Sequence, residues 1–178
     1  VQKDHLLAVK LSLEGWKLVA TIATKRLIHA RFNSPPSESF LTFIILSLVI
    51  KPGSLGIEAL SRGAAHADLV EADRRQVAVI KANLTATKTA DRADVLQSTA
   101  EDALPRMDRR YDYMLMDPPY TKPFPADVVE RIGELGLLAE GGLAIVGHAS
   151  RVEAPMVCGA MTRTQDRRYG DASLAFYE

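Results

Sequence analysis

The chain has 178 residues, of which 47% are hydrophobic and 25% are charged, and its 22 basic residues balance its 22 acidic residues. This composition is typical of a globular protein that buries a sizeable core, and the length suggests one domain with a small appendage. A single cysteine, Cys158, excludes an internal disulfide and fits a reducing, cytoplasmic compartment. The longest apolar run, residues 40–50, is too short for a bilayer span of about 20 residues, so we expect no membrane segment.

The N-terminal segment is basic although the whole chain is neutral. Residues 1–36 carry a net charge of +4, which leaves a net charge of −4 on the remainder. Residues 11–20 alternate around Glu14-Gly15 and predict a β-hairpin. We therefore expect a basic arm over residues 1–36, with this hairpin, followed by a main domain over residues 37–178. The arm is a candidate for contacts with phosphate groups, and an ordinary solvated surface is the alternative.

From residue 44 onward, short apolar runs alternate with amphipathic segments. The runs predict strands at residues 44–50, 67–70, 95–97, 111–116 and 143–146, the last after a turn at Gly141-Gly142. Helices are expected at residues 57–62, 74–87, 101–106 and 126–135, the first with Gly63 as its C-terminal cap. Residues 160–169 and 172–177 flank Tyr169-Gly170-Asp171 and predict a terminal hairpin. This alternation indicates right-handed βαβ units, a mainly parallel sheet with helices on both faces, and an antiparallel edge.

The tetrapeptide Asp117-Pro118-Pro119-Tyr120 follows one of these strands directly. The prolines end the strand, because neither has an N–H group for the ladder. The motif thus presents a carboxylate, a rigid turn and an aromatic ring at the C-terminal end of a strand, where ligands bind in open α/β sheets. Asp117 and the carbonyl of Pro118 can accept the two N–H groups of a nucleobase amine, and Tyr120 can stack on the base. A proline loop that merely ends a strand is the alternative.

Two features indicate a nucleoside-bearing cofactor. The turn from Pro52 to Gly56 lies between the first strand and its helix, where glycines permit close approach of a ligand to the backbone. Glu71 ends the second strand, 18 positions after Gly53. This is near the spacing of about 20 residues at which an acidic side chain reaches ribose hydroxyls. Turn chemistry and a solvated strand end are the structural alternatives.

Several motifs resemble the bacterial small-subunit rRNA guanine-N2 methyltransferase family in order and spacing. They are Gly56-Ile57-Glu58-Ala59-Leu60-Ser61-Arg62-Gly63-Ala64-Ala65, Val70-Glu71, Asn83-Leu84, Asp117-Pro118-Pro119-Tyr120 and Tyr169-Gly170-Asp171, and the match covers about residues 53–178. The resemblance implies an S-adenosylmethionine-dependent enzyme with a Rossmann-like class I methyltransferase fold. That fold has a central, mainly parallel seven-stranded sheet in the order 3-2-1-4-5-7-6, flanked by helices.

The resemblance also assigns roles to single residues. It implies that the target base is handled by Asp117, Pro118, Pro119 and Tyr120. It implies that the cofactor is held by Gly53, Ser54, Gly56, Glu71, Ala72, Thr99 and Ala100, where Thr99 occupies the place of an adenine-facing acid. The implied substrate is ribosomal RNA or a small-subunit particle, and we expect a monomer without a metal, since Cys158 and the four histidines show no metal-ligand spacing.

The chain departs from the family pattern before Gly53 and after the fifth strand. Ser47 stands where the family has an aspartate, and Lys51-Pro52 replaces the first glycine and the serine of its glycine-rich turn. Gly147-His148 replaces Glu-His. These differences predict weak cofactor binding.

The sequence also leaves other functions open. One is methylation of an amino group in DNA, and another is a catalytically impaired RNA-binding homologue with a disrupted cofactor turn. A nicotinamide dehydrogenase fits less well, because Lys51-Pro52-Gly53-Ser54-Leu55-Gly56 lacks the first glycine of G-x-G-x-x-G.

Overall fold

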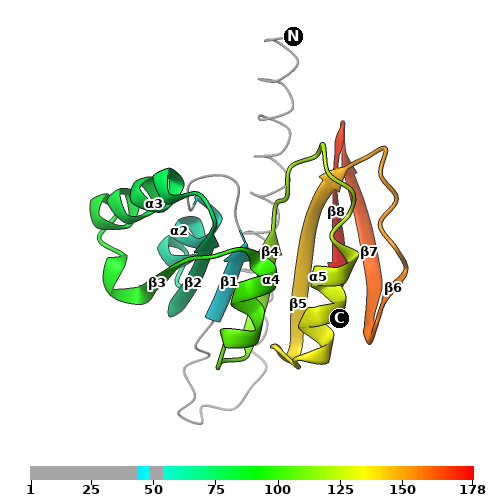
Figure 1. Cartoon of the computed structure of the whole chain (residues 1–178), viewed down its shortest axis with the longest axis horizontal. Coiled ribbons are helices and arrows are strands. Elements are labelled where there is room, and N and C mark those ends of the chain that lie inside the picture. Colours follow the sequence, from blue (N-terminus) through cyan, green and yellow to red (C-terminus); the bar gives the residue numbers. More distant parts are fainter. Residues whose placement is uncertain (1–43, 49–53) are drawn as a thin grey trace.

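A single mixed β-sheet with helices on both faces forms the body of the protein (Figure 1). The structure is a computed structural model that describes residues 44–48 and 54–178. The basic arm with its expected hairpin, and the residues Lys51, Pro52 and Gly53, lie outside the described residues. The strands are β1 Ile44–Leu48, β2 His66–Glu71, β3 Ala93–Gln97, β4 Tyr111–Met116, β5 Leu138–Ala149, β6 Val157–Cys158, β7 Met161–Tyr169 and β8 Ala172–Tyr177. The helices are α2 Ser54–Ser61, α3 Arg74–Ala86, η1 Ala90–Arg92, α4 Ala100–Ala103, η2 Leu104–Arg106 and α5 Ala126–Glu134.

The strand order is β3-β2-β1-β4-β5-β8-β7-β6. Strands β1 to β5 are parallel to one another, and β8 then pairs antiparallel with both β5 and β7. The expected count of seven strands is wrong, because the two-residue strand β6 pairs with the end of β7 and brings the number to eight. A pair of residues is too short to give a periodic signal in the sequence. The expected terminal hairpin around Tyr169-Gly170-Asp171 is confirmed as β7 and β8.

The core lies on both faces of the sheet. One hydrophobic cluster packs α2 and α3 against one face through side chains such as Leu60, Ile80 and Leu84. The other cluster packs α5 and the α4–η2 segment against the opposite face, through Leu104, Val129 and Ile132 among others. Because the central strands are buried on both faces, their sequences are apolar runs without alternation.

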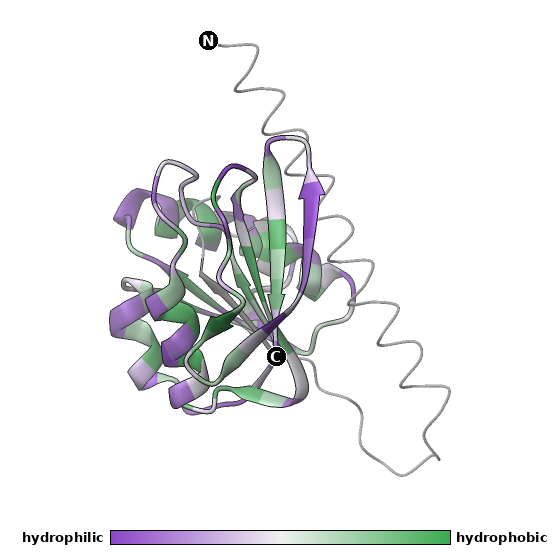
Figure 2. Ribbon diagram, turned by 90° about the vertical axis from the view of Figure 1, so that its right-hand side faces the viewer, coloured by the Kyte–Doolittle hydropathy of each residue, from purple (hydrophilic) through white to green (hydrophobic). Residues whose placement is uncertain are grey.

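The outer strand β7 has a different composition. Most of its side chains are exposed, and Figure 2 shows it as a hydrophilic strand beside apolar neighbours. β6 pairs only with Met161 and Thr162 of this strand, so the rest of β7 is an exposed edge, where charged residues discourage pairing with another chain.

Two element boundaries differ from those expected for identifiable reasons. Helix α2 begins at Ser54 and not at Ile57, so the second glycine of the predicted turn, Gly56, is helical. Strand β5 begins at Leu138, five residues before the predicted start, and Gly141-Gly142 forms an irregularity within it. A Cβ atom on Gly142 would stand 2.9 Å from the carbonyl oxygens of Ala139 and Tyr111, so this close backbone approach requires glycine. The strand therefore continues through the glycine pair, and its register against β4 shifts there.

Candidate functional site

A cleft of about 340 Å³ opens at the C-terminal ends of β2, β3 and β4. Parallel strands bring these ends to one edge of the sheet, which is the upper edge in Figure 1. The cleft walls include six of the residues expected at a site, namely Glu71, Ala72, Thr99, Ala100, Pro118 and Pro119. The structure thus brings together, on one cavity, segments that are far apart in the sequence.

Glu71 supplies a buried carboxylate to this cleft. It is the last residue of β2, and only 7% of its surface is exposed. Its Oε1 accepts a hydrogen bond of 2.8 Å from the backbone N–H of Asp73. Its Oε2 is also buried, yet no donor among the described residues bonds to it. A buried acceptor without a donor costs free energy, so this oxygen is suited to a hydroxyl group of a ligand.

Thr99 lies in the cleft wall after β3, but its side chain already has a structural partner. Its hydroxyl oxygen accepts a hydrogen bond of 3.2 Å from the backbone N–H of Asp102 and so caps α4. The hydroxyl proton can still be donated, because a hydroxyl group is both donor and acceptor. Thr99 therefore differs from a carboxylate at this place, which would only accept hydrogen bonds.

Part of the Asp117-Pro118-Pro119-Tyr120 motif borders the same cleft. Asp117 directly follows β4 and is buried, with 6% of its surface exposed, while both prolines line the cleft. The motif continues into a turn, in which the N–H of Lys122 bonds to the carbonyl of Pro119 at 2.9 Å. Residues of this motif thus stand next to the wall that contains Glu71.

The glycine-turn residues are placed differently from one another. Gly53 lies outside the described residues, and Ser54 is the first residue of α2. Gly56 packs directly on β2, where an added Cβ atom would meet the Leu69 Cδ2 atom at 2.3 Å. Its absence of a side chain thus permits close packing of helix on strand, and the structure does not place it on the cleft.

Sequence reasoning missed four polar residues of this region. Ser98, Glu101 and Lys122 line the cleft, and the last two are exposed. Arg151 follows β5, and its Nη2 donates a hydrogen bond of 3.2 Å to the carbonyl oxygen of Tyr120. The available signal was that each follows the end of a strand by a few residues, which places it at the ligand-binding edge.

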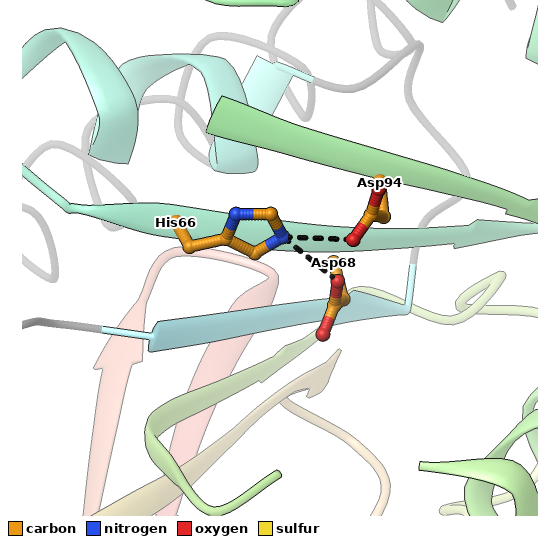
Figure 3. Close-up of side chains that lie close together, drawn as sticks. All are labelled: His66, Asp68 and Asp94. Carbon is orange, nitrogen blue, oxygen red and sulfur yellow. Dashed lines mark hydrogen bonds and ion pairs between the residues drawn. The ribbon is translucent and has the colours of Figure 1, made fainter. Parts of the chain in front are cut away.

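A second polar cluster lies at the opposite end of β2 (Figure 3). The Nε2 atom of His66 is 3.2 Å from Asp68 Oδ1 and 3.1 Å from Asp94 Oδ2. Asp68 Oδ2 also accepts a hydrogen bond of 2.6 Å from the hydroxyl of Tyr111. Asp94 Oδ2 accepts one of 3.3 Å from Arg109 Nη2. Burial, together with this bond to Asp68, raises the pKa of Tyr111. The two carboxylates thus have donors from the chain itself.

With this geometry in view, the relatives of the chain identify its family. Residues 24–178 match the family described as conserved hypothetical protein 95. The chain belongs to this family. It is 32% identical over 136 residues to YlbH of Bacillus subtilis, a protein whose name assigns it provisionally to the rRNA methyltransferases, and the match covers 75% of this chain and 74% of that one.

Two matches from Escherichia coli, one to a curated sequence and one to a solved structure, extend the comparison. Ribosomal RNA small subunit methyltransferase D is 29% identical over 126 residues, with 71% of this chain and 63% of that protein covered. The chain therefore spans less than two thirds of this relative. The solved structure of yhhF, provisionally named a methyltransferase, is 27% identical and superposes with a TM-score of 0.68 over 76% of each chain. This similarity and the strand order confirm the expected Rossmann-like class I α/β fold.

Proposed function

We propose that this protein transfers a methyl group from S-adenosylmethionine to the exocyclic N2 amine of a guanine in small-subunit rRNA. Membership of the family and the rRNA methyltransferase names of its relatives support methyl transfer to ribosomal RNA. The guanine N2 position is supported by the resemblance of the tetrapeptide motif and its neighbours. The substrate is ribosomal RNA or an assembling small subunit in the cytoplasm, and the enzyme acts as a monomer.

The observation that carries the cofactor assignment is the buried Oε2 of Glu71, which has no donor among the described residues. A carboxylate can accept hydrogen bonds from both hydroxyls of a ribose. The cleft beside it has apolar walls from Val70, Ala100, Met116 and Pro118, which suit the faces of an adenine ring. When bound, S-adenosylmethionine would supply an electrophilic methyl group.

The motif residues would orient the acceptor amine. The lone pair of an aromatic amine is delocalised into the ring, so such an amine is a poor nucleophile and gains most from positioning. In this proposal Asp117 accepts one N–H, the Pro118 carbonyl accepts the other, and Tyr120 stacks on the base. The guanine must leave its stack to reach these groups. Asp117 acts as an acceptor from the start and takes the proton only as the new bond forms.

Two measurements test the proposal. Calorimetry with S-adenosylhomocysteine and NAD in parallel should detect binding of the former alone. Incubation of labelled S-adenosylmethionine with small-subunit rRNA, with assembled small subunits and with DNA should then give label in RNA, and nucleoside analysis should recover N2-methylguanosine. Label in an adenine or cytosine amine, or in DNA alone, would contradict the assigned substrate. Binding of NAD without S-adenosylhomocysteine would contradict the assigned chemistry.

A further inference from the structure

A side chain from outside the tetrapeptide reaches back to it. Arg151 lies on the loop between β5 and β6, and its Nη2 donates a hydrogen bond of 3.2 Å to the backbone carbonyl of Tyr120. The Arg151 side chain is exposed, so this bond is not a by-product of core packing. It links two loops at the ligand-binding edge of the sheet.

The backbone on either side of Arg151 is held by a tight set of hydrogen bonds. The N–H of Ser150 donates to the carbonyl of Asp171 at 2.9 Å, and the N–H of Val152 donates to the carbonyl of Ala149 at 2.9 Å. The carbonyl of Val152 in turn accepts a hydrogen bond of 2.9 Å from Nδ1 of the buried His148. Since a carbonyl group only accepts, Nδ1 carries the proton. Arg151 therefore extends from a preorganised turn.

The loop that receives this hydrogen bond is anchored to the same histidine. Phe124, at the end of the loop, packs with its ring at 79° to the His148 ring and 5.5 Å between ring centroids. At its other end the loop forms the turn closed by Lys122 N–H and the Pro119 carbonyl. The carbonyl of Tyr120 lies within that turn, so the bond from Arg151 holds the peptide that follows the motif.

From this geometry we propose that Arg151 is a positioning residue for the Asp117-Pro118-Pro119-Tyr120 motif, an inference that rests on the proposed methyl transfer. Holding the Tyr120 carbonyl fixes the peptide plane after the tyrosine and limits rotation of the Pro119–Lys122 turn. The Pro118 carbonyl and the Tyr120 ring are then presented in one orientation. Groups that orient a substrate act best when neighbouring contacts fix their own conformation. Arg151 itself touches neither base nor cofactor in this proposal.

The experiment compares Arg151→Ala and Arg151→Lys with a matched control, Arg168→Ala. Arg168 is also exposed, lies near the same edge at the end of β7, and donates to the Gly170 carbonyl without a contact to the motif. At saturating S-adenosylmethionine and rRNA fragment, Arg151→Ala should slow single-turnover transfer about tenfold. This loss is smaller than the one from a 1 Å misplacement of reacting groups, which can slow a reaction about 100-fold. Arg151→Lys should recover part of the rate, and Arg168→Ala should transfer at nearly the wild-type rate.

Two further readouts separate positioning from RNA binding. Affinity for S-adenosylhomocysteine, and the salt dependence of RNA binding, should match between Arg151→Ala and Arg168→Ala. If Arg151→Ala instead lowers the salt slope by about one unit more than the control, with an unchanged saturating rate, Arg151 contacts a phosphate and the proposal is overturned. Equal rates for all variants would overturn it as well.

Hydrogen exchange gives a test that does not depend on activity. Amides within residues 117–125 should exchange faster in Arg151→Ala than in either the wild type or Arg168→Ala, in the protein without ligands. Unchanged exchange would overturn the positioning role. If the wild type methylates no rRNA fragment but the exchange difference is present, the link between the two loops stands and the proposed function fails.

Discussion

Strand β2 carries two buried carboxylates, Asp68 and Glu71, whose hydrogen bonding differs. Asp68 and Glu71 are equally buried, with exposed fractions of 8% and 7%. Both oxygens of Asp68 accept hydrogen bonds from the chain, one from the Tyr111 hydroxyl and one from His66 Nε2. Glu71 has a donor for one oxygen only, among the described residues. Burial alone therefore does not mark a binding group, whereas unfilled hydrogen-bonding capacity at the cleft does.

The largest expected effect concerns Asp117, a third buried carboxylate, which the proposal assigns to the ligand-binding group with Glu71. Asp117→Ala should slow single-turnover methylation of an rRNA fragment by about 10²–10³-fold, the usual loss when a preorganised polar contact at a transition state is removed. Asp117→Asn keeps an acceptor oxygen and should retain measurable activity. The affinity for S-adenosylhomocysteine, measured separately, should change little in both variants. An alanine variant with wild-type activity would show that Asp117 only ends a strand.

The next effect tests Glu71 directly. Glu71→Gln keeps the volume of the side chain and an oxygen for the Asp73 N–H, but its amide nitrogen cannot accept a hydroxyl proton. We expect S-adenosylmethionine to bind more weakly by about 1.5–3 kcal/mol, the usual contribution of hydrogen bonds to a charged group. Calorimetry measures this loss, and thermal unfolding of the ligand-free variant should match the wild type. Unchanged affinity would show that Glu71, like Asp68, is a structural carboxylate and does not bind the cofactor.

A substitution of Asp68 should lower the stability of the protein and leave its cofactor affinity unchanged. Asp68→Ala leaves the buried hydroxyl of Tyr111 and the ring nitrogen of His66 without their acceptor, which should lower the free energy of unfolding by about 1–3 kcal/mol. Urea unfolding measures the loss. Cofactor affinity should equal that of the wild type, because Asp68 does not line the cleft. A variant that folds normally and loses cofactor affinity would reverse the comparison.

Much of the fold could be predicted, because its signals are local. Strand β4 was predicted with its observed bounds from an apolar run followed by two prolines, and the terminal hairpin from its Gly170 turn. Two element boundaries differ from the prediction where a local signal has two physical causes. Strand β5 begins before Gly141-Gly142 and continues through it, and helix α2 begins before Gly56, which packs on Leu69.

The candidate site was predictable to a similar degree. Glu71 ends β2, and Pro118 and Pro119 come just after β4. Because the ends of parallel strands converge, the meeting of these residues on one cleft follows from topology. The unpaired Oε2 of Glu71 depends on which donors lie around it, and the bond from Arg151 joins residues 31 positions apart. Such contacts depend on tertiary packing, which periodicity and spacing do not encode.

The smallest effect is a difference in pH dependence at the Asp68 end of the strand. Burial, and then the hydrogen bond to Asp68, raise the pKa of Tyr111 above its ordinary value of 10.0. Below pH 10 the hydroxyl keeps its proton in both the folded and the unfolded chain, so this tyrosine adds no pH dependence. As the pH rises above 10, the unfolded chain releases the proton while the folded chain retains it, and the free energy of unfolding falls.

Tyr111→Phe removes this group. The free energy of unfolding of the variant should therefore fall less steeply with pH than that of the wild type, and the two slopes should differ by up to about 1.4 kcal/mol per pH unit. Urea unfolding of both proteins between about pH 9 and 11 measures the two slopes. Burial also raises the pKa of Tyr177, but this tyrosine is present in both proteins and contributes equally to both slopes. Identical slopes would show that the surroundings of Asp68 do not keep Tyr111 protonated in the folded chain. The difference between Asp68 and Glu71 would then rest only on the position of Glu71 at the cleft.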